Sequence, residues 1–186
     1  MGRIVVLRYA KALFSVAAEK NQIDEYNEAV KGVLAILADE ENQLLAVINH
    51  LSISAAEKMT TMRAIFEGKL PEDFIGFFEL VFKRGRQADL VAILQQFGLL
   101  YKEHKRIASA KLYSADEMPQ EKLAEIAEIL GKKLDKTIEF ELVIDTSLIA
   151  GFRVDVDGFV FDSSLKAQLG QMKKQLLTGG RHTVLP

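Results

Sequence analysis

The sequence predicts a mainly α-helical protein, in which a six-helix bundle is followed by a small α/β domain with a β-hairpin and a terminal helix. Two observations support this fold class. Apolar residues recur at helical spacing from the start of the chain to about His104, and residues that alternate between apolar and polar begin near Ile107. This change of period places a domain boundary near Lys105. We therefore expect a helical bundle over residues 1–105 and an α/β domain over residues 106–186.

The first three helices are predicted from the spacing of apolar side chains. The first segment has apolar residues at i, i+3, i+7 and i+10, which lie on one side of a helix: Leu7, Ala10, Phe14 and Ala17. Residues 23–37 repeat this spacing, which predicts a second helix. A short third helix is expected over residues 43–49.

The next three helices are marked by start and stop signals. Ser54–Glu57 has the sequence of a capping box, in which the serine side chain and the glutamate side chain each bind a free backbone N–H of the first turn. This helix is expected to end before Gly68. Pro71 starts the fifth helix, because proline lacks an N–H that the first turn does not need, and Gly85 ends it. The sixth helix is expected over residues 88–104.

The second half of the chain alternates strands with helices. Residues 107–113 and 137–144 alternate between apolar and polar side chains, which predicts two strands with one buried face each. Pro119 starts a helix between them. After residue 162, a terminal helix is predicted from apolar residues at i, i+4, i+7 and i+11: Leu165, Leu169, Met172 and Leu176.

A β-hairpin is predicted before the terminal helix. Asp157-Gly158 is a favoured two-residue type I′ turn. Such a turn places Arg153 opposite Asp162, where opposite charges attract. It also places five apolar side chains on one face: Phe152, Val154, Val156, Phe159 and Phe161. Asp162, Ser163 and Ser164 are candidates for the cap of the terminal helix.

The composition excludes several classes of protein. Hydrophobic residues make up 49% of the chain, which is enough for a folded core, and the net charge is −2. A nearly neutral chain has no overall attraction to nucleic acid or anionic lipid, and no apolar run approaches the roughly 20 residues of a membrane helix. The chain has no cysteine, so disulfides, thiolate chemistry and cysteine-ligated metals are excluded. We expect no nucleic-acid partner and no direct membrane insertion.

The sequence offers no clear catalytic, cofactor or metal site. His50, His104 and His182 have no second ligand at metal-binding spacing on a helix face, so surface or helix-end histidines are the simpler interpretation. Glycine motifs for nucleotide phosphates and the G-x-S-x-G motif for a serine nucleophile do not occur in the sequence. We therefore expect a protein that is not an enzyme, with no catalytic residues, cofactor or metal.

Two charged clusters have simple structural interpretations. Asp155, Asp157 and Asp162 resemble part of a calcium loop, but no glutamate closes the loop and the flanking segments are strands. We expect Asp155 to lie on the solvent-exposed face of the hairpin and Asp157 to form the turn. Asp162 is expected to cap the following helix or to pair with a residue on the opposite strand. Lys83–Arg86 is a basic helix end, where cations complement the helix dipole, and it lacks the aromatic residues of a nucleic-acid patch.

The first and fifth predicted helices are more apolar than one core face requires. Beside the stripe of the first helix that faces its core, a second stripe follows at i, i+4, i+7 and i+11. The candidate partner-binding residues are this stripe and its counterpart on the fifth helix: Val5, Tyr9, Ala12, Val16, Gly76, Phe77 and Leu80. Two interpretations are open. Both helices could be central in the bundle and buried by their own chain, or the extra surface could be a groove for a partner's amphipathic helix.

Segments along nearly the whole chain resemble one protein family. Arg8–Phe14 (RYAKALF) opens a helical domain, and the tail combines AGFRV at Ala150–Val154 with DSSLKAQL at Asp162–Leu169. Gly85-Arg86 and Ser109–Ala115 fit the same pattern between them. Together and in this order they resemble the delta subunit of bacterial rotary ATP synthase, the family of the mitochondrial oligomycin-sensitivity-conferring protein.

The resemblance implies a mechanical role in the peripheral stalk. The helical domain would bind the N-terminal helices of alpha subunits at the top of the catalytic head, and the α/β domain would bind the C-terminal end of the b subunit. The protein would hold the head against rotor torque at the cytoplasmic face of the bacterial inner membrane, attached only through the complex. Two other hypotheses are a helical adaptor for an amphipathic helix of another complex, and an enzyme whose site forms only in a complex.

Overall fold

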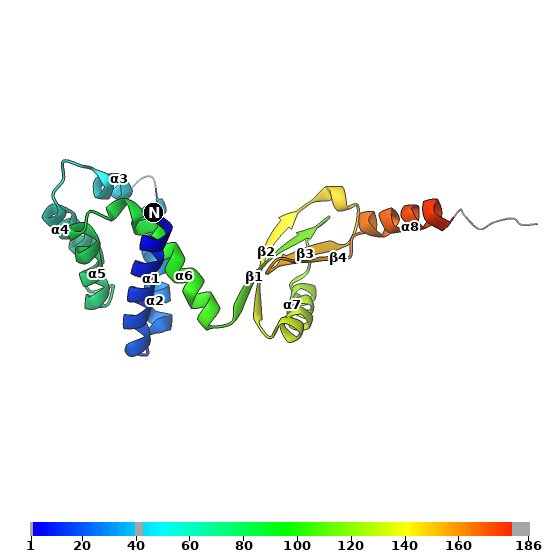
Figure 1. Cartoon of the computed structure of the whole chain (residues 1–186), viewed down its shortest axis with the longest axis horizontal. Coiled ribbons are helices and arrows are strands. Elements are labelled where there is room, and N and C mark those ends of the chain that lie inside the picture. The colour runs from blue at the N-terminus through cyan, green and yellow to red at the C-terminus, as the bar shows by residue number, and fades with distance from the viewer. Residues whose placement is uncertain (1, 40–42, 180–186) are drawn as a thin grey trace, which may run out of the picture. The chain divides into compact units, whose positions relative to one another are not determined.

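The structure is a computed structural model that describes residues 2–39 and 43–179, with side chains described as far as residue 173. His182 lies outside the described residues, as does the side chain of Leu176. The chain divides into two units, Met1–His104 and Lys105–Pro186, which are treated separately below. The fold is mainly helical with one four-stranded sheet, as Figure 1 shows. At this level the predicted fold class is confirmed.

The described part of the N-terminal unit consists of helices. They are α1 (Gly2–Glu19), α2 (Ile23–Ala38), α3 (Leu44–Asn49), α4 (Ala55–Phe66), α5 (Glu72–Lys83), the 3-10 helix η2 (Gln87–Asp89) and α6 (Leu90–His104). Helix α6 packs against α1 and α2, and α4 packs against α5. The expected sixth helix begins later than predicted, because η2 occupies the turn that leads into it.

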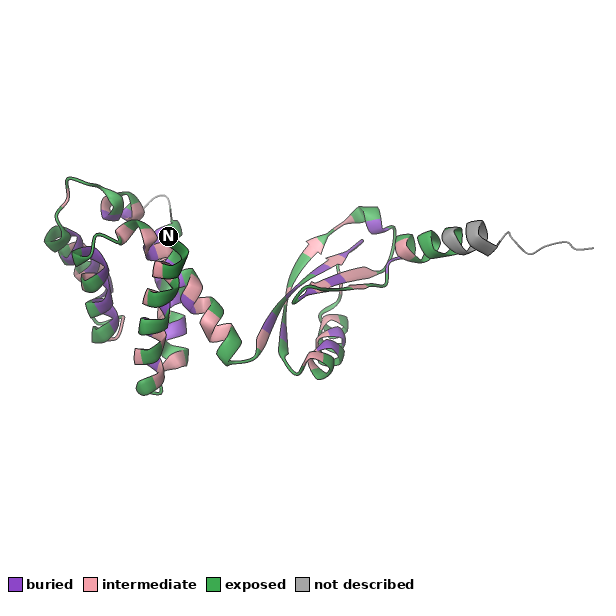
Figure 2. Cartoon of the chain, viewed as in Figure 1, coloured by how far each residue is buried: buried purple, intermediate pink, exposed green. Residues whose placement is uncertain are grey.

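All six helices contribute buried side chains to one hydrophobic core. The largest of these side chains are aromatic, and they include Tyr26 of α2, Phe74 and Phe78 of α5, and Phe97 of α6, all fully buried. The Phe74 and Phe78 rings meet edge to face at 5.3 Å between centroids. Figure 2 shows the buried residues of α5 along much of its length. The apolar spacing read from the sequence therefore marks most of the core side of these helices, although Leu7 at the start of the first stripe is exposed.

The capping box predicted at the start of α4 is present. The Glu57 amide donates to Ser54 Oγ at 3.3 Å, and the Ser54 amide donates to the Glu57 carboxylate at 2.9 Å. The Ser54 amide and the Ser54 hydroxyl both donate to the Glu57 carboxylate, and these two hydrogen bonds lower the pKa of Glu57 because they favour its charged form. Within the described ranges, every helix is either too short or too polar to cross a bilayer.

The C-terminal unit is a four-stranded sheet with two helices. Its elements are β1 (Ile107–Ser114), α7 (Gln120–Leu134), β2 (Thr137–Ile144), the 3-10 helix η3 (Thr146–Leu148), β3 (Phe152–Val156), β4 (Phe159–Asp162) and α8 (Leu165–Gly179). The strand order is β2-β1-β3-β4, with β1 parallel to β2 and antiparallel to β3. The parallel pair needs a crossover connection, which α7 provides while it packs on β2.

The hairpin has the predicted turn and register. Asp157 and Gly158 have φ values of 48° and 81°, as a type I′ turn requires, and Arg153 lies opposite Asp162. The expected attraction between these two charges is present, because the pKa of Asp162 is lowered by hydrogen bonds from Ser164 and also by Arg153, but this is not the closest contact of Arg153. Arg153 pairs with Asp155 on its own strand at 3.2 Å and covers the Tyr113 ring at 4.2 Å. The Asp162 carboxylate accepts a hydrogen bond from the Ser164 backbone N–H at 2.9 Å, just before α8 begins.

Candidate partner-binding groove between α1 and α5

The two apolar stripes of α1 have different surroundings. The core stripe is buried at Ala10, Leu13 and Ala17. In the second stripe, the Tyr9 side chain is half-buried and Ala12 is exposed. The other two members, Val5 and Val16, are half-buried. The chain's own helices therefore bury one stripe of α1 and cover the other in part, with Tyr9 and Val16 packed against the core and Ala12 at the surface.

Helix α5 is buried on most sides, and its open surface is narrow. Phe77 is only 7% exposed and belongs to the core, whereas Leu80 is 45% exposed. Gly76 is exposed, and a Cβ atom added there would meet nothing within 4 Å. Phe77 also meets Tyr9 of α1 edge to face, with ring centroids 6.4 Å apart. This aromatic contact joins the two helices beneath the surface that they leave open.

Helices α1 and α5 run in opposite directions. Lys20, just after α1 ends, forms an ion pair with Asp73 in the first turn of α5. The beginning of α1 therefore lies toward the end of α5. This arrangement brings side chains from the first half of α1 together with those that follow the last turn of α5.

A groove of about 540 Å³ lies where these segments meet. Three of the candidate residues line it, namely Tyr9, Ala12 and Leu80. The other four candidates, Val5, Val16, Gly76 and Phe77, are not among its lining residues. The remaining lining residues are Arg8, Arg84 and Arg86, none of which was selected from the sequence as a binding residue.

Two of these arginines are positioned by the way α5 ends. The Gly85 amide donates to the Phe82 carbonyl at 3.0 Å, and the Arg86 amide donates to the Val81 carbonyl at 2.9 Å. This pair of hydrogen bonds is the Schellman motif, which needs a residue with positive φ between the helix and the following chain. Gly85 supplies it with φ of 64°. The predicted helix stop therefore also fixes the backbone that carries Arg84 and Arg86.

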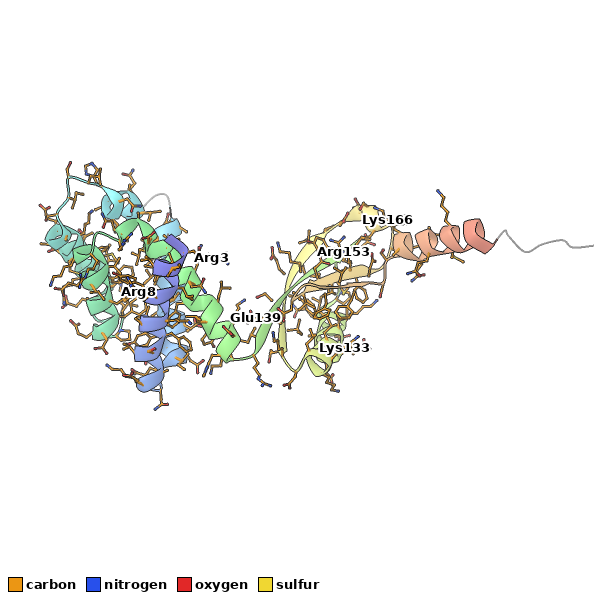
Figure 3. The ribbon with its side chains drawn as sticks, in the orientation of Figure 1. Arg3, Arg8, Lys133, Glu139, Arg153 and Lys166 are labelled. Carbon is orange, nitrogen blue, oxygen red and sulfur yellow. The ribbon has the colours of Figure 1, made fainter. Side chains whose placement is uncertain are left out.

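The three guanidinium groups are only weakly neutralised by the protein itself. Arg86 lies 3.7 Å from Asp89, and Arg8 lies 6.0 Å from the centre of the Tyr9 ring, at the limit of a cation–π contact. Within the described part of the chain, neither Arg8 nor Arg84 forms an ion pair. Figure 3 shows Arg8 on the side of α1 toward α5. The groove thus combines an apolar floor with three cations.

The sequence held a signal for these arginines that the helix-end interpretation did not use. Arg8 precedes Ala12 by four residues, and Arg84 follows Leu80 by four residues, so each lies beside a candidate apolar residue on its helix. Lys83–Arg86 was assigned only to the helix dipole. A basic residue next to a surplus apolar stripe is a better indication of a binding groove than either feature alone.

The groove is suited to binding an amphipathic helix. Its lining has an aromatic ring, an exposed leucine and a small alanine that allows close approach. None of the described lining residues is acidic or a histidine, so the groove itself offers no acid–base pair. Among the described residues there is also no group of three or more histidines, aspartates and glutamates placed to hold a metal ion.

A second apolar surface lies on α8 of the C-terminal unit. Leu165, Leu169 and Met172 are 40%, 49% and 60% exposed and follow one another at i, i+4 and i+7. They therefore form a stripe along one side of the helix, as predicted. Ser164 caps the helix by accepting from the Ala167 amide at 3.2 Å. Hydrogen bonds from Ser164 to Asp162 lower the pKa of Asp162 and brace the cap.

Comparison with known proteins identifies relatives along almost the entire chain. The family profile described as ATP synthase delta (OSCP) subunit matches residues 5–176. A protein named ATP synthase subunit delta from Clostridium kluyveri is 33% identical over 172 residues, which covers 92% of this chain and 94% of the relative. Another of the same name from Lachnoclostridium phytofermentans is 31% identical and covers 95% of this chain and 97% of the relative.

A solved structure has a similar fold. In the cryo-EM structure of the Toxoplasma gondii mitochondrial ATP synthase hexamer, one chain superposes with a TM-score of 0.66. The match covers 92% of this chain and 97% of that chain, at 21% sequence identity. At this identity the similarity establishes a shared fold and nothing further.

Proposed function

The chain belongs to the ATP synthase delta (OSCP) subunit family and is a non-catalytic peripheral-stalk subunit of ATP synthase, and on this premise we propose how its two units act. The N-terminal unit, residues 1–105, binds N-terminal helices of alpha subunits in the groove between α1 and α5. The C-terminal unit, residues 106–186, binds the C-terminal end of the b subunit. The chain thereby links the catalytic head to the membrane sector.

The groove is the observation that carries the first half of this proposal. An amphipathic helix that docks in a groove buries its apolar face against exposed apolar side chains. Leu80 and Ala12 are exposed, and Tyr9 is half-buried and anchored by its contact with Phe77. Aromatic residues at the centre of an interface often carry much of the binding energy. Tyr9 is therefore expected to be the main anchor for the docked helix.

The exposed stripe on α8 supports the second half. Leu165, Leu169 and Met172 present apolar surface on a helix that packs, at its beginning, against η3. Surface of this kind on a helix is typical of a contact with another helix. We assign it to the end of the b subunit.

The mechanical role follows from binding at both units. A connector that resists rotor torque must transmit force, and a continuous hydrophobic core suits this because packed interiors deform little. We propose that α1–α6 act as a single bundle for this reason. The protein would be peripheral to the membrane, held through the complex at the cytoplasmic face.

The alpha-subunit site is tested by filling the groove. Ala12→Trp places a large ring where the docked helix would lie, and an exposed position tolerates it without unfolding. We expect the affinity of the full chain for a peptide of the alpha subunit's N-terminal segment to fall by about a hundredfold, the effect of roughly 3 kcal/mol. Isothermal titration calorimetry measures this, and circular dichroism verifies the fold.

The matched control is Ala64→Trp, an equally bulky change at an exposed alanine of α4 that does not line this groove. It should leave the affinity unchanged. Equal affinities for the native chain and Ala12→Trp would rule out this groove as the alpha-subunit site. If the native chain bound an unrelated amphipathic helix as tightly as the alpha segment, a general helix adaptor would be the better description.

A further inference from the structure

We propose that the groove between α1 and α5 selects a docking helix by its carboxylates, through Arg8, Arg84 and Arg86. This inference rests on the proposed binding of a partner helix in the groove and adds a chemical requirement to it. The occupant is an amphipathic helix of the alpha subunit with aspartate or glutamate beside its apolar face. Those carboxylates would lie along the part of the groove that the three arginines line.

The charge of the groove is local and opposite to that of the chain. The whole chain has a net charge of −2, yet the charged residues that line the groove are all arginines. They come from the first half of α1 and the end of α5, which lie together because the two helices are antiparallel, with Lys20 and Asp73 paired at the other end. Like charges that line one groove repel one another, so a bound anion would relieve an unfavourable arrangement.

The arginines differ in how available they are. Arg86 is partly neutralised by Asp89 at 3.7 Å. Arg8 has an aromatic neighbour but no carboxylate partner, and Arg84 has no ion pair among the described residues. Arginine can bind a carboxylate through two parallel N–H donors, which makes it a selective reader of that group. Arg84 and Arg8 should therefore contribute more than Arg86.

An apolar groove alone would select poorly. Leucine, isoleucine and phenylalanine side chains fit apolar surfaces of similar size almost interchangeably, and many amphipathic helices share this pattern. Carboxylates placed against the arginines would fix which side and which register of the helix enters. Electrostatic matching of this kind mainly supplies specificity and speed of association, with a smaller gain in affinity.

The test uses the full chain and two peptides measured by calorimetry. One peptide is the alpha subunit's N-terminal segment, and the other is the same segment with every aspartate and glutamate replaced by asparagine and glutamine. We expect the amide peptide to bind roughly tenfold weaker at 0.15 M salt. The affinity of the acidic peptide should fall as salt rises, because salt screens the pairs, and that of the amide peptide should barely change.

Variants of the arginines assign the effect to the groove. Arg84→Gln should weaken the acidic peptide about threefold to fivefold and leave the amide peptide unaffected, which is the pattern of a direct pair. Arg3→Gln is the matched control, because Arg3 is an exposed arginine, on the helix α1 that also carries Arg8, and it does not line the groove. Figure 3 labels both Arg3 and Arg8. Arg3→Gln should affect neither peptide.

The outcomes separate this inference from the proposed function. If both peptides bind equally and Ala12→Trp blocks both, the groove binds a helix but does not select carboxylates. The inference is then overturned, while the proposed alpha-subunit site stands. If neither peptide binds the native chain, the proposed alpha-subunit site fails and the inference falls with it. Equal losses for Arg84→Gln and Arg3→Gln would show an effect of net charge, which also contradicts the inference.

Discussion

The N-terminal and C-terminal units cover their apolar residues to different extents. In the N-terminal unit, the described helices share one core that contains ten or more fully buried large side chains, such as Phe74, Phe78 and Phe97. In the C-terminal unit the core is smaller, and α7 covers only part of one face of the sheet. Leu142 and Ile144 at the end of β2 stay 50% and 60% exposed.

This difference indicates how each unit binds a partner. The N-terminal unit has enough buried surface to be stable by itself, and its exposed large apolar residues, such as Leu51 and Leu99, are scattered singly over its surface. The C-terminal unit presents apolar residues on an edge strand and on α8, including Phe159 and Leu169. A partner would therefore dock onto a finished N-terminal unit, whereas a partner of the C-terminal unit would complete its packing.

The largest effect is expected from Phe78→Ala in the N-terminal core. Removing a fully buried ring leaves a cavity and should lower the free energy of unfolding by about 3–5 kcal/mol. Urea unfolding followed by circular dichroism measures this. Hydrogen exchange should speed up in α1–α6 and stay unchanged in β1, if the units unfold separately. Leu99→Ala, at a 60% exposed position, is the control with little expected effect. Equal acceleration in β1 would show that the units unfold together.

An intermediate effect is expected from Gly151→Ala in the C-terminal unit. Gly151 has φ of 85°, and an added Cβ atom would lie 2.6 Å from the Ser163 carbonyl oxygen. Gly158→Ala is a matched control, because Gly158 has φ of 81° but open space around it. The backbone conformation costs each variant about 1–2 kcal/mol. Thermal unfolding should show a greater loss for Gly151→Ala, and equal losses would mean that the close approach to Ser163 is easily relieved.

The smallest effect on stability is expected from Leu169→Gln on α8. Leu169 is half exposed and both residues favour helices, so the free energy of unfolding should change by less than about 0.5 kcal/mol. Affinity for the C-terminal segment of the b subunit should nevertheless fall at least about fivefold, as measured by fluorescence anisotropy. Gln171→Ala, on a different side of α8, should leave that affinity unchanged. An unaltered affinity for Leu169→Gln would remove the stripe from the proposed contact.

Most elements of this fold could be predicted because their signals are local. The Ser54–Glu57 capping box and the Asp157-Gly158 turn each involve neighbours only a few residues apart, so the sequence alone identifies them. The sixth helix was predicted to begin earlier than α6 does, because the residues of η2, Gln87–Asp89, are equally compatible with the first turn of an α-helix. The β1–β2 pairing was not predicted, since alternation specifies the faces of a strand and not its neighbours.

The candidate site was predicted only in part. Tyr9, Ala12 and Leu80 were selected as surplus apolar residues, and they line one groove. Phe77 was selected by the same criterion but is buried in the core, because spacing cannot tell which of two apolar stripes the chain itself will cover. The arginines of the groove were not selected, because Arg84 and Arg86 were assigned only to the helix dipole and Arg8 was read as part of the polar strip of the first helix.

The sequence by itself determined the helices, the hairpin and its register, and the presence of a second apolar stripe on α1. Each of these depends on the repeat of a helix or strand or on a cap within one turn. Only the tertiary structure decided how far each stripe is covered, that Arg8 lines one groove with Arg84 and Arg86, and that the Arg153 guanidinium hydrogen-bonds to Asp155. These outcomes depend on how whole helices and strands pack, and on which charged groups the packing brings within hydrogen-bond distance of one another.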